Sequence, residues 1–240
     1  MQRYFVSKEN EKFVLNSNDF HHIKDVMRIK SNGNIICICD NHSYLCSIEY
    51  DNSSYDIKII EEITKDVELT KDVILYQALI KNDKFDLVIQ KATELGVTDI
   101  VPTAFSRSVV KVEKEKQESK INRYNKIVKE ACEQSHRQIL PVIHPYIDVK
   151  KIKLDEDTLG LIAYENNGNY HSFYEALKDI NNYRKIAIVI GPEGGFSDDE
   201  VSYLKNEGFK SISLGKRILR SETASMYALS VIGYYLEGMM

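Results

Sequence analysis

Two loops near the end of the sequence contain the residue types best suited to hold a ligand. The first, residues 190–196, reads IGPEGGF, and the second, residues 214–224, reads LGKRILRSETA. Each follows a short apolar segment that predicts a β-strand. Ligands of open α/β sheets bind beyond the carboxyl ends of the strands. We therefore expect the two loops to lie at one edge of the same sheet and to share one ligand.

The chemistry of the first loop follows from its glycines and its proline. The loop matches neither G-x-G-x-x-G nor G-x-x-x-x-G-K-[ST], so a dinucleotide site and a P-loop have no specific support. Pro192 between glycines lets the backbone approach a flat ligand closely without forming a phosphate cradle. Backbone groups could then bind the edge of an adenine, with Ile218 and Leu219 as an apolar wall. The alternative for this loop alone is an ordinary strand-to-helix turn.

Two charged residues, Arg220 and Glu222, lie two positions apart at the start of the last predicted helix. A methyl transfer requires alignment of the nucleophile, the methyl group and the leaving sulfur, and stabilisation of charge at the nucleophile. Arg220 could stabilise a deprotonated uracil, and Glu222 could orient that arginine or accept the proton. The structural alternative for Glu222 is that the helix dipole favours an acid in the first turn.

From residue 73 onward, strand-like and helix-like segments alternate. Strands are predicted at residues 73–79, 99–101, 159–164, 185–190 and 211–214, and helices at 85–95, 114–139, 172–180, 198–206 and 222–237. We expect the second strand to stop at Pro102, and the fourth helix to begin with a capping box formed by Ser197 and Glu200. The alternation predicts an α/β fold with a parallel sheet.

The N-terminal part is predicted to be mostly β-structure. Strands are expected at residues 3–6, 34–39, 44–50 and 56–63, with one short helix at 18–27 that begins at Asn18 or Asp19. Closely spaced strands with a single short helix suggest a small barrel. The charged residues 65–72 lack periodicity and are interpreted as a linker.

The composition is ordinary for a globular protein in water. The 240 residues are 43% hydrophobic and 28% charged, and no apolar run is long enough to span a membrane. The first residues lack the apolar stretch of a signal peptide, which indicates the cytosol. Cys37, Cys39, Cys46 and Cys132 do not have metal-ligand spacing, so we expect buried thiols and no metal site.

The net charge of −4 argues against a nucleic-acid partner, but the basic residues are unevenly distributed. Those concentrated between residues 105 and 137 are Arg107, Lys111, Lys114, Lys116, Lys120, Arg123, Lys126, Lys129 and Arg137. A local basic stripe can bind phosphates even on an acidic protein, although a solvated helix face is preferred for the lysines alone. Arg107 and Arg137 are the preferred phosphate or base contacts, and an ion pair with a neighbouring glutamate is the alternative for each.

Both loops, together with segments elsewhere, resemble those of a known family. The loops are similar to the two motifs of the SPOUT methyltransferases that bind S-adenosylmethionine (SAM). The match is closest to the RsmE family, which methylates N3 of a uridine in 16S rRNA. Further matching segments are RYF at 3–5, HIKDVMR at 22–28, QALIK at 77–81 with Lys84, QKATELGV at 90–97, SRS at 106–108 and EACEQS at 130–135. The chain departs from the family pattern at Asp25, Met27 and His144.

The resemblance implies an architecture and a set of contacts. Residues 1–68 would form a PUA-like β-barrel that binds RNA, and residues 72–240 a SPOUT α/β domain with a C-terminal trefoil knot. The protein would be a cytoplasmic homodimer with its active site near the subunit interface, and Arg220 and Glu222 would be catalytic. The residues expected to hold SAM are Ile190, Gly191, Pro192, Gly195, Leu214, Gly215, Ile218, Leu219 and Thr223. Those expected to contact rRNA, alone or in the small ribosomal subunit, are Arg3, His22, Arg28, Lys84, Arg107 and Arg137.

Three other functions stay open at the level of the sequence. The enzyme could methylate another RNA atom, such as a ribose 2′-OH of tRNA. The chain could also be a non-catalytic RNA-binding or assembly factor. A nucleotide-dependent oxidoreductase is the third possibility, and the missing dinucleotide motif disfavours it.

Overall fold

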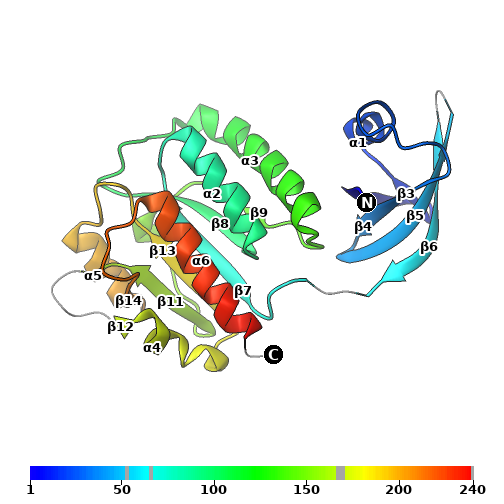
Figure 1. Cartoon of the computed structure of the whole chain (residues 1–240). Coiled ribbons are helices and arrows are strands. Elements are labelled where there is room, and N and C mark those ends of the chain that lie inside the picture. Colours follow the sequence, from blue (N-terminus) through cyan, green and yellow to red (C-terminus); the bar gives the residue numbers. More distant parts are fainter. Residues whose placement is uncertain (52–53, 65–66, 166–170, 239–240) are drawn as a thin grey trace. The chain divides into compact units, whose positions relative to one another are not determined.

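The chain folds into two units (Figure 1). The computed structural model describes residues 1–51, 54–64, 67–165 and 171–238. The first unit comprises Met1–Glu68 and Cys132–Ile139, and the second comprises Leu69–Ala131 and Leu140–Met240. Within the expected linker, Lys65 and Asp66 lie outside the described residues.

The N-terminal unit is built on a four-stranded sheet with the order β1-β4-β5-β6. Its strands are β1 (Arg3–Phe5), β4 (Gly33–Cys39), β5 (His42–Tyr50) and β6 (Tyr55–Ile63). β1 runs parallel to β4, and the other pairs are antiparallel. Asp40 and Asn41 join β4 to β5 with positive φ angles of 50° and 64°, as a two-residue hairpin turn requires. A second hairpin, β2 (Ser7–Glu9) and β3 (Lys12–Val14), was not predicted from the sequence.

The predicted helix at residues 18–27 is present in two parts. A short α-helix, α1 (Ser17–His21), continues into a single π-helical segment, η1 (His22–Val26). The helix starts earlier than expected, because Asn16 caps it by accepting a hydrogen bond of 2.8 Å from the Asp19 amide. Single π-turns within helices occur often at functional sites.

All strand pairs among the described residues of the C-terminal unit are parallel, which confirms the predicted α/β fold with a parallel sheet. The sheet order is β10-β8-β7-β13-β11-β14-β12, with β9 also paired to β8. The strands are β7 (Asp72–Ala78), β8 (Asp99–Ala104), β9 (Val142–Ile143), β10 (Ile147–Asp148), β11 (Thr158–Ala163), β12 (His171–Ser172), β13 (Lys185–Ile190) and β14 (Lys210–Ser213).

Helices cover both faces of this sheet. Alternate residues of β13 divide between them, because successive side chains of a strand point to opposite faces. Ala187 and Val189 join a buried cluster with Val201 and Leu204 of α5 (Asp198–Asn206). The opposite face carries α6 (Ser221–Glu237), which packs against α2 (Asn82–Glu94), β7 and β13 (Figure 1). The remaining helical segments are α3 (Lys114–Ser135), η2 (Val149–Lys151), α4 (Phe173–Leu177) and η3 (Ile180–Asn182).

Several predicted element ends are wrong: α2 begins at Asn82 instead of residue 85, and α4 ends at Leu177 instead of residue 180. Two further ends have a clear physical cause. Strand β8 continues through Pro102 to Ala104 instead of stopping at the proline. Helix α3 ends at Ser135 instead of residue 139, because His136 takes a φ of 67° that no α-helix tolerates. By contrast, β13 and α5 have the predicted bounds, and the Ser197–Glu200 capping box is present.

None of the helices in the described part of the chain has the length and apolar character needed to cross a membrane.

Candidate active site

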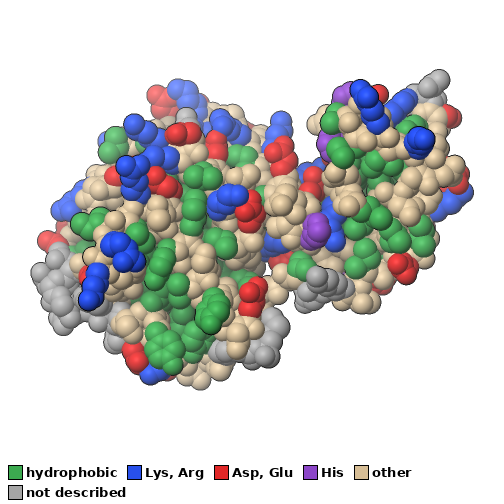
Figure 2. Space-filling model, in the orientation of Figure 1, with side chains coloured by type: hydrophobic (Ala, Val, Ile, Leu, Met, Phe, Trp, Pro, Cys, Tyr) green, Lys and Arg blue, Asp and Glu red, His purple; other side chains and the backbone are tan. Residues whose placement is uncertain are grey.

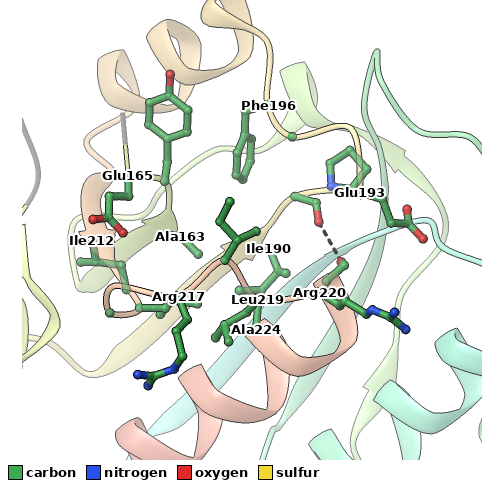
Figure 3. Close-up of a pocket in the computed structure, with 18 of the residues that line it drawn as sticks. Ala163, Glu165, Ile190, Glu193, Phe196, Ile212, Arg217, Leu219, Arg220 and Ala224 are labelled. Atoms are coloured by element: carbon green, nitrogen blue, oxygen red, sulfur yellow. Dashed lines mark hydrogen bonds between the residues drawn. The ribbon is translucent and has the colours of Figure 1, made fainter. Parts of the chain in front are cut away.

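The two glycine-containing loops line one cavity of about 860 Å³ (Figure 3). It lies beyond the carboxyl ends of β13, β14 and β11, which end at Ile190, Ser213 and Ala163. The expectation that both loops share one edge of the sheet is confirmed. The cavity is lined by most of the residues expected to hold the cofactor: Ile190, Gly191, Pro192, Gly195, Leu214, Gly215, Ile218 and Leu219. Thr223 is the exception, since it is exposed on α6 and is not among the lining residues.

The cavity wall is largely apolar at its base and charged at its rim. Ala163, Ile190 and Leu219 contribute apolar surface, and Glu193 and Arg220 lie together on one side in Figure 3. Ile218 is fully exposed, with a relative accessibility of 103%, although it lies beside the cavity. An apolar side chain so placed gains a packing partner when a ligand fills the cavity.

Glycine conformations shape both loops. Gly195 has a φ of +70° and closes a turn by donating to the Pro192 carbonyl over 2.9 Å. Gly215 has a φ of +103°, and an added Cβ there would meet no atom within 4 Å, so its backbone faces open space. A Cβ at Gly191 would lie 2.8 Å from the Phe196 ring. The requirement for glycine at 191 therefore comes from the protein itself, and not only from the ligand.

The Arg107 side chain is hydrogen-bonded to the first loop. Its guanidinium donates to the carbonyl oxygen of Phe196 over 2.9 Å, and the side chain also borders the cavity. The adjacent Ser106 amide donates to Glu200 over 2.6 Å, and Ser197 donates to the other oxygen of that carboxylate. Burial raises the pKa of Glu200, but these backbone hydrogen bonds outweigh it, and the net pKa lies below its usual value. The 105–108 turn thus fixes the loop that precedes α5.

The two expected catalytic residues occupy different surroundings. Arg220 is exposed at the cavity rim, as the N-cap residue of α6. Glu222 is buried, and its Oε1 lies 2.8 Å from Nζ of Lys84 on α2. Burial raises the pKa of Glu222, but the hydrogen bond from Lys84 and the charges of Lys84 and Arg220 outweigh it, so the net pKa is lowered. Glu222 is therefore a carboxylate at neutral pH.

Several cavity residues had no signal in the sequence. Tyr164 and Glu165 follow β11, and Ile212 lies in β14. The Ser213 hydroxyl donates to Glu165 over 2.8 Å and accepts from the Gly215 amide over 3.1 Å. β11 lies between β13 and β14 in the sheet but precedes both in the chain, so only the sheet order reveals that its end faces the same cavity.

The residues expected to contact RNA divide between the two units. Arg3, His22 and Arg28 belong to the N-terminal unit, and Lys84 and Arg107 to the C-terminal unit. Arg28 is exposed, whereas Arg3 is half-buried, and its burial lowers its pKa. The Tyr4 hydroxyl lies 3.0 Å from Nδ1 of His22.

Arg137 does not present a surface to RNA. Its side chain is 3% exposed, and its guanidinium donates through two nitrogens, over 2.9 and 2.6 Å, to one carboxylate oxygen of Glu68. The other carboxylate oxygen accepts from the backbone amides of Gln138 and Ile139. Arg137 therefore forms the ion pair that was the alternative to an RNA contact, because a paired guanidinium without exposed surface cannot reach a phosphate.

No group of three or more His, Cys, Asp or Glu side chains suited to a metal ion occurs among the residues that the structure describes. The thiols of Cys37, Cys39, Cys46 and Cys132 are free and buried, as expected.

A family model described as an RNA methyltransferase domain matches residues 67–233, which defines the class of the protein. Ribosomal RNA small subunit methyltransferase E of Bacillus subtilis (strain 168) is 35% identical, over 99% of this chain and 98% of that protein. The protein of the same name from Mesomycoplasma hyopneumoniae (strain 232) is 36% identical, over 96% and 98% respectively. The chain belongs to the ribosomal RNA small subunit methyltransferase E family, as the sequence resemblance predicted.

Solved structures agree with this assignment. A crystal structure of ribosomal RNA small subunit methyltransferase E from Neisseria gonorrhoeae, bound to S-adenosyl methionine, has a TM-score of 0.85 and 29% identity over 98% of both chains. A putative methyltransferase from Legionella pneumophila, in complex with SAM, has a TM-score of 0.84 and 28% identity, again over 98% of both chains.

Proposed function

We propose that this chain transfers the methyl group of SAM to N3 of one uridine in the 16S rRNA of the small ribosomal subunit. The observation that carries the proposal is the single cavity formed by the 190–196 and 214–220 loops. Relatives named for methylation of small-subunit rRNA, and a related structure that holds SAM, support both the substrate class and the cofactor.

The cavity fits the chemistry of SAM. Gly215 leaves open space against its backbone, and the exposed Ile218 can pack on a flat adenine ring. The lining carries carboxylates on Glu165, Glu193 and Asp198, which can pair with the positive sulfonium and amino groups of SAM. It also carries basic side chains, which can pair with the carboxylate of SAM: Arg107, Lys216, Arg217 and Arg220. When bound there, SAM supplies a methyl group activated by its sulfonium.

Arg220 and Glu222 are assigned to the uracil. Arg220 stabilises the negative charge that develops when N3 loses its proton, since it is a permanent cation at the cavity rim. Glu222 carries a buried Oε2 without a hydrogen-bond partner among the described residues. A carboxylate with a lowered pKa is a weak base. We therefore assign Glu222 to the orientation of Arg220 rather than to proton transfer.

The N-terminal unit is proposed to be a PUA-like RNA-binding domain. Its four-stranded sheet and the β2–β3 hairpin supply the strands of a small barrel. Arg3, His22 and Arg28 are proposed to contact rRNA there, with Lys84 and Arg107 contributing from the C-terminal unit. Arg137 is omitted because it is both buried and paired with Glu68, whereas Lys84 keeps exposed surface beside its pair with Glu222.

The C-terminal unit is proposed to form a trefoil knot and to dimerise. After β14 the chain returns across β11, because α6 packs against β13 and β7. A threaded C-terminal segment would need such a return. Figure 2 shows hydrophobic side chains gathered on this unit. The exposed ones include Leu87 of α2 and Tyr227 and Tyr234 of α6. An exposed apolar surface of this kind suits a second copy of the chain, close to the start of α6. With rRNA as substrate, the cytoplasm is the proposed location.

Nucleoside mass spectrometry tests the substrate. Deletion of the gene should remove 3-methyluridine from 16S rRNA, and the purified protein with SAM should restore it. Persistence of 3-methyluridine in the deletion strain would reject N3 of this uridine and favour another RNA atom, including a tRNA ribose. Calorimetry with SAM tests catalysis against a purely RNA-binding role, since a protein without the cofactor site should give no binding heat.

A further inference from the structure

A buried hydrogen-bond network lies between β7 and the first turn of α6. Its centre is Gln77, whose relative accessibility is 0% and which pairs in register with Ile190 at the end of β13. Gln77 shares its sheet face with Val73 and Leu75, both also at 0%. A polar amide on this apolar face costs free energy of folding unless its hydrogen bonds are satisfied, so its hydrogen-bond partners explain why it is there.

Both the NH2 group and the oxygen of the Gln77 amide have hydrogen-bond partners. Its Nε2 donates to the Ser221 hydroxyl over 3.0 Å and to the Ala78 carbonyl over 3.1 Å. Its Oε1 accepts from the hydroxyl of Ser225. The opposite amide orientation would set Oε1 against the Ala78 carbonyl oxygen, so the hydrogen-bond partners determine which end is the donor.

The network reaches the cofactor loop through Ser221. Because its oxygen accepts from Gln77, the Ser221 hydroxyl is free to donate, and it does so to the Gly191 carbonyl over 2.7 Å (Figure 3). Gly191 is the first residue of the glycine-rich turn, and Ser221 lies between Arg220 and Glu222. One chain of hydrogen bonds thus joins the end of β7, the first loop and the start of α6.

The start of α6 has no capping side chain, because Arg220 at the N-cap makes no side-chain cap hydrogen bond. In place of a cap, the hydrogen bonds of Ser221 to Gly191 and Gln77 connect the start of α6 to the first loop and to β7. Any shift of Ser221 moves its neighbours Arg220 and Glu222 relative to the 190–196 loop.

We infer that Gln77 is a positioning residue for methyl transfer: through Ser221 it fixes Arg220 and Glu222 relative to the loop that holds the cofactor. Gln77 is not among the residues lining the cavity, so it acts without touching SAM. The inference rests on the proposed function, since it concerns the same site. It predicts that Gln77 contributes to kcat and not to the affinity for SAM.

The variant Gln77→Glu distinguishes a positioning role from a purely structural one. A protonated carboxyl reproduces the two hydrogen bonds to α6, with its O–H donating to Ser221 and its C=O accepting from Ser225, and loses only the bond to the Ala78 carbonyl. An ionised carboxylate cannot donate, and it faces the Ala78 carbonyl oxygen. Burial raises the pKa of a carboxyl in such a place. We expect the kcat of this variant to be about tenfold to a hundredfold below the wild type at pH 8.5, and to recover toward the wild-type value at pH 6.

The measurements are the steady-state kcat for methylation of small ribosomal subunits from a deletion strain, SAM affinity by calorimetry, and Tm, at both pH values. SAM affinity should stay within about threefold of the wild type. The matched control is Thr103→Val, which removes a buried side-chain hydrogen bond within β8, outside this path, and should retain most of the kcat. A ratio of variant to wild-type kcat that does not change with pH, or equal losses in kcat and SAM affinity, would overturn the inference.

Gln77→Met covers the case in which the glutamate variant does not fold. Methionine has a similar length and no hydrogen-bonding amide, so kcat should fall with little change in SAM affinity and should not recover at pH 6. Wild-type kcat in this variant would also overturn the inference. The wild-type protein distinguishes failure of this inference from failure of the proposed function. If the wild type methylates no rRNA, the proposed function is wrong, whatever the Gln77 variants show.

Discussion

Lys84 Nζ and Glu222 Oε1 lie 2.8 Å apart, joining α2 to the first turn of α6. From the sequence, Lys84 was expected to contact RNA and Glu222 to be catalytic, with no indication that they form a pair. The pair explains why a carboxylate persists at a buried position next to the cavity, since the lysine hydrogen bond and charge offset its desolvation.

Removing the lysine should therefore disturb Glu222 first. Lys84→Met leaves a buried carboxylate without its partner, which raises the pKa of Glu222 and lowers the free energy of unfolding by roughly 1–3 kcal/mol. Urea denaturation measures the loss. Adding Glu222→Gln should return part of it, because the second change removes the unpaired charge. The matched control is Lys91→Met on the same helix, which breaks the more exposed pair with Glu94 and should cost less than about 1 kcal/mol. Equal losses in both lysine variants would contradict a special role for the Lys84 pair.

Arg220→Ala should lower turnover far more than SAM affinity, because the arginine is assigned to the uracil and not to the cofactor. A loss of roughly a hundredfold or more in kcat is expected, with little change in the calorimetric affinity for SAM. Arg217→Ala is the matched comparison, since Arg217 is exposed at the same rim. Proportional losses in kcat and affinity for Arg220→Ala would show that it only supports the pocket.

Gly191→Val should abolish SAM binding through Phe196. The added carbon atoms meet a ring only 2.8 Å from the first of them, and that ring is itself part of the cavity wall. Calorimetry checks the loss of binding. Gly233→Ala is the control, because its Cβ would meet only the Leu95 carbonyl oxygen at 4.0 Å within a helix. It should bind SAM normally, with unchanged or slightly higher stability. Retained affinity in Gly191→Val would contradict the pocket assignment.

Glu200 should make stability depend on pH below its ordinary pKa of 4.5. Its folded-state pKa is lowered, so its contribution is fully present above the unfolded pKa and is lost as pH falls through the folded value. Glu200→Gln should cost about 1–2 kcal/mol at neutral pH. The stability difference between wild type and variant should shrink as pH falls from about 5 toward 3. Urea titrations across this range measure it, and a constant difference would refute the assignment.

Strand β8 illustrates where local reasoning about the sequence fails. Proline lacks an N–H group, so a strand was expected to stop at Pro102. The edge of β8 beyond β7 is covered by two short strands, with β9 pairing at Asp99 and Ile100, and β10 at Thr103 and Ala104. Pro102 falls in the gap between them, where no neighbouring strand on that side needs its missing donor. Only the arrangement of β9 and β10 makes the longer strand possible.

The sequence by itself determined the elements whose signals are local. The bounds of β13 and α5, the capping box of Ser197 and Glu200, and the placement of both ligand loops after parallel strands all follow from residues within a few positions of one another. These features depend on backbone hydrogen bonding and hydrophobic periodicity, which neighbouring residues largely decide.

The tertiary structure alone decided which distant side chains became partners. Arg137 pairs with Glu68, Lys84 with Glu222, and Gln77 with Ser221, across separations of 69, 138 and 144 positions. Many charged and polar residues could satisfy one another equally well by type. The choice among them depends on which strands and helices pack together, and on the need for each buried polar group to find a partner, so it is a property of the folded chain rather than of any short segment.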